Sequence, residues 1–344
     1  MPDDMPFAIE NKTIAVFRQM LAAAKHVLIL SHMHPDGDAV GSSLGLTHLL
    51  HRHCPHLDVA TLLPNDCPAS YLFLEGSDRL LSGESHPAAC REAFGRADLI
   101  IGVDFNNTPR VGCLQELLTA SQAAKVLIDH HPQPETGEFD LVCSHPELSS
   151  ASELVYWVAR AAWGEGCLDV ASARCLYAGI SSDTGSFAFS NERPSVYEAA
   201  AHMVALPIQA ADIYNRTFNN YSVSRMQFFA FCLNERMRIF AQQHFAYIYI
   251  SMADQARFGT HDADTEGFVN AVMKMDQIQV GALVKEQPDR IRISLRSKQD
   301  FDVNAYARKH FEGGGHVKAA GATSYKSLTE TVEYLEQTML SELA

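Results

Sequence analysis

The chain has 344 residues, of which 47% are hydrophobic and 20% charged, the composition of an ordinary globular protein. This length favours two domains over a single core. The 27 basic and 41 acidic residues give a net charge of −14, which disfavours a long polyanion held by many phosphate contacts but permits a short anionic ligand in a local pocket.

Other compositional features bear on the compartment. No apolar run reaches the roughly 18 residues of a membrane span. The 8 cysteines are scattered without a C-x-x-C pair, which indicates reduced thiols rather than a disulfide framework. The acidic N-terminal segment lacks the apolar stretch of a signal peptide. We therefore expect a cytoplasmic protein with no membrane contact.

Strands alternate with helices in the first half of the chain. Apolar runs predict strands at 27–30, 58–63, 98–103 and 125–128. Helical spacing predicts helices at 11–24, 87–96, near 111–120, 149–163 and 169–180. Alternation at this rhythm predicts βαβ units and a doubly wound parallel sheet.

The most informative stretch is residues 31–43, SHMHPDGDAVGSS, which follows the first strand. We place His32, Asp36 and Asp38 on a loop at the carboxyl end of that strand, where open α/β sheets bind ligands. Two carboxylates so close together repel each other unless a cation holds them. The alternative is an Asp-rich turn in which Asp36 or Asp38 only caps the next helix.

Further polar residues follow other elements of the same half. Asp104 comes after the third strand, His130 after the fourth, and Asp183 ends a helix-like segment. Because the strand ends of a parallel sheet meet at one edge, we expect these residues to converge with the first loop. Four carboxylates and two imidazoles suit two divalent cations with one bridging carboxylate. The absence of thiolates favours Mn²⁺, Mg²⁺ or Co²⁺.

The pattern changes beyond Pro207. We expect a helix at 222–237, alternating strands of the antiparallel kind at 244–250, 278–285 and 290–296, and a closing helix at 328–343. A glycine-rich motif, GGGHVKAAG, spans 313–321. Its glycines allow backbone N–H groups to approach a phosphate, and the segment from His316 onward could offer a helix N-terminus.

Five motifs carry a family resemblance. SHMHPDGDAVGS, VDFNN, IDHHP and SSDTGSF resemble the four motifs of the DHH phosphoesterases, and GGGHVKAAG resembles that of their associated C-terminal domain. The resemblance implies a catalytic domain at 1–205, a helical connector at 206–235 and a smaller α/β substrate-binding domain with a mixed sheet at 236–344. The active site would lie in the cleft between the domains.

The resemblance also implies roles for individual residues. His32, Asp36 and Asp104 would hold one metal ion, and Asp38, Asp104, His130 and Asp183 the other, with Mn²⁺ the expected ion. Asp129 would orient a ligating histidine, and His131 would face the substrate phosphate. The substrate-binding residues would be Arg296, Ser297, Gly313, Gly314, Gly315, His316, Asn270 and Arg110. Arg292 shares a strand face with Arg296, so one or both would point into the cleft.

Within the superfamily, the chain most resembles small enzymes that degrade very short RNA and dephosphorylate 3′-phosphoadenosine 5′-phosphate. The expected reaction is attack on phosphorus by a hydroxide shared between the two metal ions. The partners would be short single-stranded RNA or a nucleotide, with no long duplex, and the resemblance suggests a homodimer. Two alternatives remain open. One is a manganese pyrophosphatase or exopolyphosphatase, and the other is a non-catalytic nucleotide-binding module.

Overall fold

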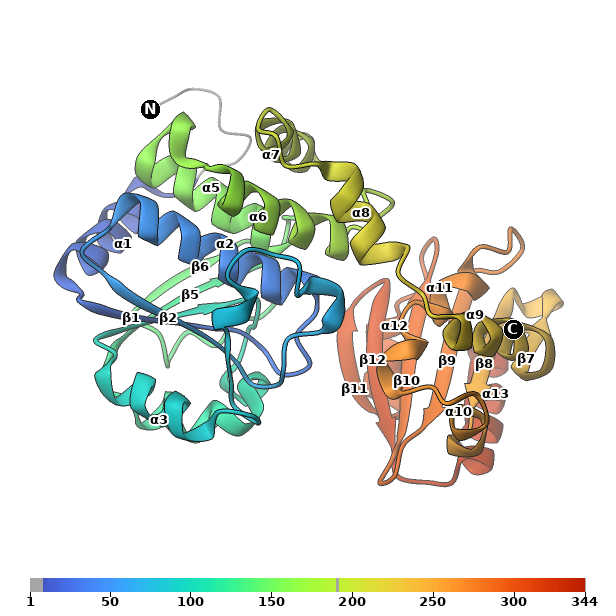
Figure 1. Ribbon diagram of the computed structural model, residues 1–344. Coiled ribbons are helices and arrows are strands. Elements are labelled where there is room, and N and C mark those ends of the chain that lie inside the picture. Colours follow the sequence, from blue (N-terminus) through green and yellow to red (C-terminus); the bar gives the residue numbers. More distant parts are fainter. Residues whose placement is uncertain (1–8, 190–191, 344) are drawn as a thin grey trace. The chain divides into compact units, whose positions relative to one another are not determined.

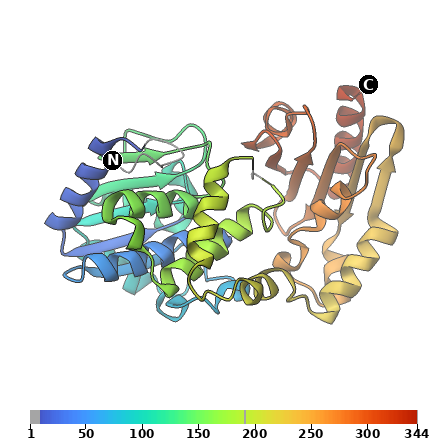
Figure 2. The same cartoon turned by 90° about the horizontal axis from the view of Figure 1, so that it is seen from above.

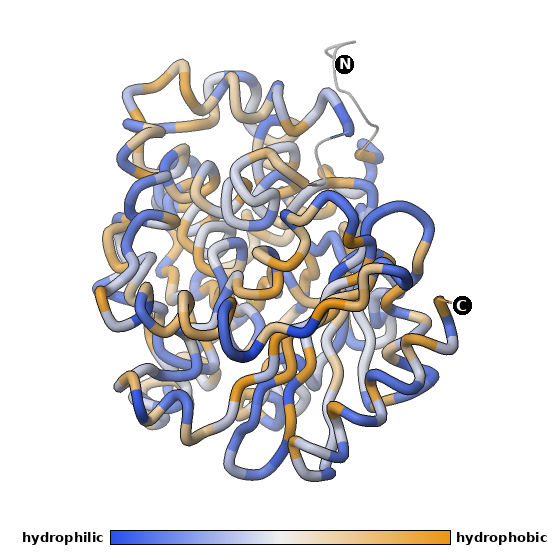
Figure 3. The backbone as a smooth tube through the Cα atoms, turned by 90° about the vertical axis from the view of Figure 1, so that its right-hand side faces the viewer, coloured by the Kyte–Doolittle hydropathy of each residue, from blue (hydrophilic) through white to orange (hydrophobic). Residues whose placement is uncertain are grey.

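The computed structural model describes residues 9–189 and 192–343. The chain divides into two compact units, residues 1–220 and 221–344 (Figure 1). Apolar segments, orange in Figure 3, recur along the elements of both units, and polar segments, blue, gather in the connections. No helix in the described part of the chain combines the length and apolar character needed to cross a bilayer. All eight cysteines are free thiols.

The first unit is built on a six-stranded parallel sheet in the order β3-β2-β1-β4-β5-β6. Its strands are β1 His26–Leu30, β2 Asp58–Leu63, β3 Leu81–Ser82, β4 Leu99–Val103, β5 Ala124–Asp129 and β6 Leu141–Ser144. The predicted parallel sheet is confirmed. The strand order reverses between β1 and β4, and doubly wound sheets bind ligands in the crevice at such a switch point.

Helices cover both faces of this sheet, as Figures 1 and 2 show. One hydrophobic cluster joins it to α1, α2, α5 and α6, and a second cluster lies on the opposite face with α3 and α4. The helices of this unit are α1 Asn11–Ala23, α2 Gly37–His53, α3 Pro87–Arg96, α4 Gln115–Ala120, α5 Ala151–Trp163, α6 Val170–Asp183, α7 Pro194–Val204 and α8 Ala210–Phe218. The segment before α4, Thr108–Leu114, is a 3-10 helix.

The second unit is built on a mixed six-stranded sheet in the order β11-β12-β10-β9-β8-β7. Its strands are β7 Met237–Phe240, β8 Phe245–Ile250, β9 Val280–Glu286, β10 Ile291–Ser297, β11 Glu312–His316 and β12 Ala319–Ser324. Its helices are α9 Val223–Phe231, α10 Met252–Phe258, α11 Phe268–Met273, α12 Val303–His310 and α13 Leu328–Glu342. The predicted two-domain α/β fold with a mixed second sheet is thus confirmed.

Several local expectations are wrong. β8 and β9 pair in parallel, not antiparallel, because α10 and α11 lie between them in the chain and provide a crossover. The helix expected at 222–237 ends at Phe231, and β7 follows a five-residue π-helical turn. The glycine-rich motif offers no helix N-terminus, because its glycines form β11, which turns directly into β12.

Candidate metal centre and active site

The predicted ligands of the first unit converge at the carboxyl edge of its sheet. His32 and Asp36 follow β1, Asp104 follows β4, and His130 follows β5. Asp38 lies in the first turn of α2 rather than on the loop where we placed it. Asp183 is the last residue of α6. Residues from five separate elements thus come together at the switch point of the sheet.

Asp104 lies at the centre of this group. Its side chain is 3% exposed, and its two oxygens point to different histidines: Oδ2 lies 3.2 Å from Nε2 of His32, and Oδ1 lies 3.5 Å from Nε2 of His130. Its backbone adopts φ +62°, a left-handed conformation uncommon outside glycine that asparagine and aspartate tolerate best. An uncommon backbone conformation at a functional residue typically serves to aim the side chain.

Backbone contacts orient the rings of His32 and His130 as in metal-ligating histidines. Nδ1 of His32 donates to the carbonyl of Met33 at 2.9 Å, and Nδ1 of His130 donates to the carbonyl of Leu148 at 3.4 Å. This arrangement leaves Nε2 of each ring as the lone-pair nitrogen, directed at the carboxylates. Backbone acceptors on the far nitrogen fix ring orientation in this way at metal sites.

Asp38 is buried and positioned by the N-terminus of α5. Its Oδ2 accepts from the backbone N–H of Ala151 at 2.6 Å, and its Oδ1 accepts from that of Ser152 at 2.9 Å. Helix N-terminal N–H groups favour a negative charge here. We did not predict this support from the sequence, although Ser150 and Glu153 in the S-x-x-E pattern mark the start of that helix.

Asp36 combines the two roles that the sequence left open. Its Oδ1 accepts from the backbone N–H groups of Asp38 and Ala39, at 3.0 and 3.1 Å, and so caps α2. The same oxygen lies 3.8 Å from Nε2 of His32. The capping contacts therefore fix the carboxylate beside the histidine.

Asp183 joins the group because α2 and α6 lie unusually close together. A Cβ added at Gly41 would lie 2.6 Å from the carbonyl oxygen of Cys175 and 2.8 Å from Gly179, so any larger residue would separate the helices. Oδ2 of Asp183 lies 3.4 Å from Nε2 of His130. This side chain is 31% exposed, the least enclosed after Asp36.

The electrostatics fit divalent cations. Burial, followed by the charges of Asp104 and Asp183, raises the pKa of Asp38 well above its usual value. Burial raises the pKa of Asp183 to about 7; His130 opposes this shift, and Asp36 and Asp104 add to it. Burial also favours protonation of Asp104, but the neighbouring imidazoles of His130 and His32 outweigh it and hold the pKa of Asp104 well below the usual range. Crowded carboxylates of this kind ionise fully only when positive charge lies among them.

Three overlapping groups of residues each bring their ligand atoms within 4.8 Å of one another: His32, Asp36 and Asp104; Asp38, His130 and Asp183; and Asp104, His130 and His131. The first group contains the three residues expected for one ion, and the second contains three of the four residues expected for the other. The fourth, Asp104, is not in the second group, although its Oδ1 lies 3.5 Å from Nε2 of His130. The donor set of carboxylate and imidazole suits divalent cations that prefer oxygen and nitrogen ligands. The residues present therefore fit a pair of divalent ions.

The contact of Asp129 differs from our expectation. Its carboxylate accepts from Nδ1 of His131 at 2.8 Å and from the backbone N–H of His131 at 3.1 Å, so it orients His131 and not one of the two histidines of the predicted ligand sets. Asp129 is fully buried at the end of β5. Nδ1 of His131 also lies 3.7 Å from Oδ1 of Asp104, so this ring belongs to the same cluster.

The remaining predicted residues lie outside the cluster. Arg110, in the first unit, is close enough for its charge to oppose protonation of His32. In the second unit, Arg296 and His316 both lie in register with Ala319, on either side of β12. Gly313, Gly314 and Gly315 precede His316 in β11, and Asn270 lies in α11. Ser297 donates its hydroxyl to the carbonyl of Phe301 at 2.6 Å, a structural contact at the end of β10.

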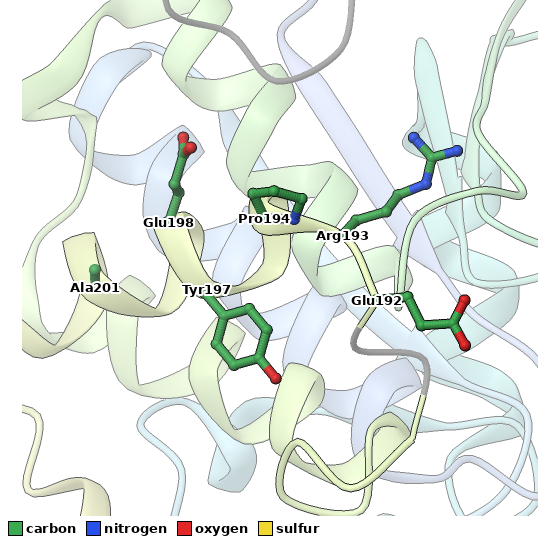
Figure 4. A pocket seen from close by; sticks show the side chains of 6 residues that line it. All are labelled: Glu192, Arg193, Pro194, Tyr197, Glu198 and Ala201. Carbon is green, nitrogen blue, oxygen red and sulfur yellow. The ribbon is translucent and has the colours of Figure 1, made fainter.

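A separate open recess of about 530 Å³ lies along α7 (Figure 4). It is lined by Glu192, Arg193, Pro194, Tyr197, Glu198 and Ala201. None of the predicted site residues is among them, and two of the six are acidic, which disfavours a phosphate ligand there. The chemistry of the first unit is therefore concentrated at the sheet edge and not in this recess.

The fold and the cluster define a class: a two-unit α/β protein with a candidate paired metal centre at the switch point of a parallel sheet. The DHH family, N-terminal domain, matches residues 26–180, and the DHHA1 domain matches residues 242–341. The chain belongs to the DHH family.

Two curated relatives match most of the chain. The "probable bifunctional oligoribonuclease and PAP phosphatase NrnA" of Streptococcus mutans is 31% identical over 329 residues, covering 94% of this chain and 98% of the relative. The "bifunctional oligoribonuclease and PAP phosphatase NrnA" of Bacillus subtilis is 27% identical and covers 87% of this chain and 89% of the relative.

Solved structures share the fold. An exopolyphosphatase-related protein from Bacteroides fragilis superposes with a TM-score of 0.92 at 32% identity, covering 97% of both chains. RecJ from Thermus thermophilus, solved in complex with Mn²⁺, superposes with a TM-score of 0.58 at 12% identity, covering 99% of this chain and 56% of RecJ. The second likeness concerns the fold alone.

Proposed function

We propose that this protein is a metal-dependent phosphoesterase that hydrolyses short oligoribonucleotides to nucleoside monophosphates and 3′-phosphoadenosine 5′-phosphate to AMP. The observation that carries the proposal is the convergence of three groups of carboxylate and imidazole ligands, two of which contain Asp104. The names of the NrnA relatives, which match the chain over most of its length, support the substrate class.

We assign His32, Asp36 and Asp104 to one divalent ion and Asp38, Asp104, His130 and Asp183 to the other, with Mn²⁺ the expected ion and Mg²⁺ or Co²⁺ able to replace it. When bound, such ions activate water at neutral pH and stabilise negative charge on a phosphoryl group. The backbone N–H groups of Ala151 and Ser152 at the helix N-terminus fix the orientation of the Asp38 carboxyl group and favour its charged form once a cation offsets the effect of burial. The N-cap contact of Asp36 likewise fixes the orientation of its carboxylate, which would ligate the other ion.

His131 is the proposed proton donor to the leaving oxygen. Because the carboxylate of Asp129 accepts the Nδ1 proton of His131, the ring presents Nε2 to its surroundings. In the imidazolium form of His131, which the buried carboxylate of Asp129 stabilises, Nε2 carries the proton that would pass to the leaving oxygen. Asp129 thus acts as a positioning residue for His131.

The second unit would bind the rest of the substrate. Arg296 and His316 lie in the same row across the sheet, and both can donate to a terminal phosphate. We assign Gly313–Gly315, Ser297, Asn270 and, from the first unit, Arg110 supporting roles in substrate binding. In this scheme, residues 1–205 form the catalytic domain, 206–235 a connector and 236–344 the substrate domain. The protein would act in the cytoplasm, and a homodimer is the expected assembly.

A substrate panel tests the proposal. Purified protein with Mn²⁺ is incubated with a diadenylate, 3′-phosphoadenosine 5′-phosphate, pyrophosphate and polyphosphate, and the products are separated by anion exchange. We expect AMP from the first two substrates and no hydrolysis without divalent metal. No AMP from the diadenylate with Mn²⁺, Mg²⁺ or Co²⁺ would contradict the proposal.

One alternative has a specific observation in its favour. The Bacteroides fragilis structure is named as exopolyphosphatase-related, at a TM-score of 0.92. The same panel decides between the two functions: phosphate released from polyphosphate much faster than AMP from the diadenylate would favour cleavage of phosphoanhydrides. A protein that binds nucleotide but cleaves none of these substrates would be the non-catalytic module.

A further inference from the structure

One face of the second sheet carries positive charge above small residues. Along β10, Ile291, Ile293 and Leu295 are buried, whereas the alternate residues Arg292, Ser294 and Arg296 face the other side. Their partners across the antiparallel pair with β12 are Thr323, Gly321 and Ala319. We call these six residues the β10–β12 floor.

The neighbouring strands β8 and β9 are covered on this side of the sheet. On β8 and β9 a hydrophobic cluster packs against α9 and α11, through residues such as Ile248, Leu283 and Phe268. Within the described part of the chain, no residue of the β10–β12 floor belongs to that cluster. Arg292 is exposed, and the other five residues are only partly buried, so this floor is accessible to a ligand.

The guanidinium of Arg292 leans along the strand toward Arg296. A Cβ added at Gly321 would lie 3.4 Å from Nη2 of Arg292, so the cationic group lies above Gly321. Gly321 is in register with Ser294, which lies midway between Arg292 and Arg296. The glycine leaves room for the guanidinium close to the sheet.

Arg292 has no direct ion-pair partner in the described residues, although the carboxylate of Asp262 is close enough for its charge to favour the protonated guanidinium. Among the residues that the structure describes, its side chain makes no hydrogen bond and no ion pair. Its register neighbour Lys285 differs, because Nζ of Lys285 lies 2.8 Å from Oδ1 of Asp262 and donates to Thr265. Arg292 therefore keeps its hydrogen-bond donors available for an anion, whereas its neighbour Lys285 is already paired.

The spacing matches an oligonucleotide. The Cα positions of Ser294 and Arg296 are two strand residues, or about 7 Å, apart, a step similar to the separation of successive phosphates in an extended strand. Proteins that bind single strands use cationic groups that track the backbone in this way. We infer that Arg292 contacts the next phosphate of the substrate beyond the one at Arg296, which makes the β10–β12 floor a subsite for a third nucleotide. This inference rests on the proposed function.

The test compares substrates that differ by one nucleotide. Wild type, Arg292→Ala, Arg292→Lys and Arg290→Ala are assayed with Mn²⁺ on 5′-phosphorylated diadenylate and triadenylate. Arg290 is the matched control, because it is nearby and partly exposed but bonds to Gln287 at 3.0 Å outside the floor. We expect Arg292→Ala to lower kcat/KM on the triadenylate roughly fivefold, the effect of one partly exposed charged contact. Activity on the diadenylate should stay within error, Arg292→Lys should retain most activity, and Arg290→Ala should match wild type.

Salt dependence provides a second readout. Loss of one phosphate contact should reduce the slope of log kcat/KM against log salt by about 0.7 for the triadenylate and leave it unchanged for the diadenylate. Equal effects of Arg292→Ala on both substrates, or no effect on either, would overturn the subsite while leaving the proposed function intact. Failure of wild type to cleave either RNA would instead overturn the proposed function and the subsite with it.

Discussion

The cluster of the first unit and the β10–β12 floor of the second unit are built in contrasting ways. At the cluster, Asp38, Asp104 and His130 are almost fully buried, and backbone groups hold the side chains of Asp38 and His130. On the floor, Arg292 and Arg296 are long side chains on a strand face that solvent reaches. Buried, pre-oriented groups suit chemistry, where small displacements are costly. Exposed cations suit recognition, where each contact contributes modestly.

The largest expected effect is at the bridging position. Asp104→Asn should lower kcat on a diadenylate by roughly 10³-fold or more, because it removes the charge shared between the two ligand groups. Asparagine tolerates the φ of +62°, so the fold should persist, as circular dichroism can check. The matched control is Asp58→Asn, an exposed residue at the start of β2. Unchanged turnover in Asp104→Asn would contradict the bridging role.

Substitutions of Asp36 and Asp38 should differ in their effect on stability, and each should weaken the binding of a different metal ion. Asp38→Asn places an amide NH₂ against the backbone N–H groups of Ala151 and Ser152, which should cost about 2 kcal/mol. Asp36→Asn keeps a good N-cap residue and should leave the melting temperature nearly unchanged. Calorimetric titration with Mn²⁺ should show each variant weakening a different ion. Equal melting temperatures, or loss of the same ion in both variants, would contradict these assignments.

Metal binding should stabilise the protein more strongly as pH rises. In the metal-free fold the pKa of Asp183 is raised from 3.8 to about 7, so the folded state holds a proton that the unfolded chain releases. The stability of the metal-free protein should therefore fall between about pH 4 and 7. The pKa of His130 is also raised, so the stability of the metal-free protein should continue to fall above pH 6.5. Because cations displace these protons, the Mn²⁺-induced rise in melting temperature should be several degrees larger at pH 8 than at pH 6. Differential scanning fluorimetry with and without EDTA checks this, and a rise independent of pH would oppose it.

Among these four predictions, the smallest effect is expected at Arg296. Arg296→Ala should raise KM for a 5′-phosphorylated diadenylate about tenfold and change kcat little, because it removes one charge-assisted contact to a terminal phosphate. The same variant should behave like wild type on a diadenylate without that phosphate. Equal losses on the two substrates would show that Arg296 does not recognise the terminal phosphate.

The two regions also differ in how far the sequence predicted them. The strands of the first sheet are short apolar runs, and parallel topology brings their ends together, so His32, Asp104 and His130 could be grouped from the sequence alone. The partner of Asp129 could not be assigned in this way. Both histidines after Asp129 are within reach, and only side-chain geometry selects His131.

The second unit was less predictable, because its local signals are ambiguous. Glycine runs occur in loops, helix ends and strands, so GGGH gave no indication that it forms the edge strand β11. The direction of β8 relative to β9 depends on the crossover between them, and periodicity does not report it. The position of the Arg292 guanidinium above Gly321 depends on side-chain conformation, which strand spacing alone does not predict.

The most direct test of the paired centre is electron paramagnetic resonance of the protein titrated with Mn²⁺. We predict that wild type binds two ions and gives the spectrum of an exchange-coupled pair, as expected if Asp104 bridges them, whereas Asp104→Asn gives only isolated Mn²⁺ signals. A wild-type spectrum of isolated ions at every stoichiometry, with full activity, would contradict the paired centre.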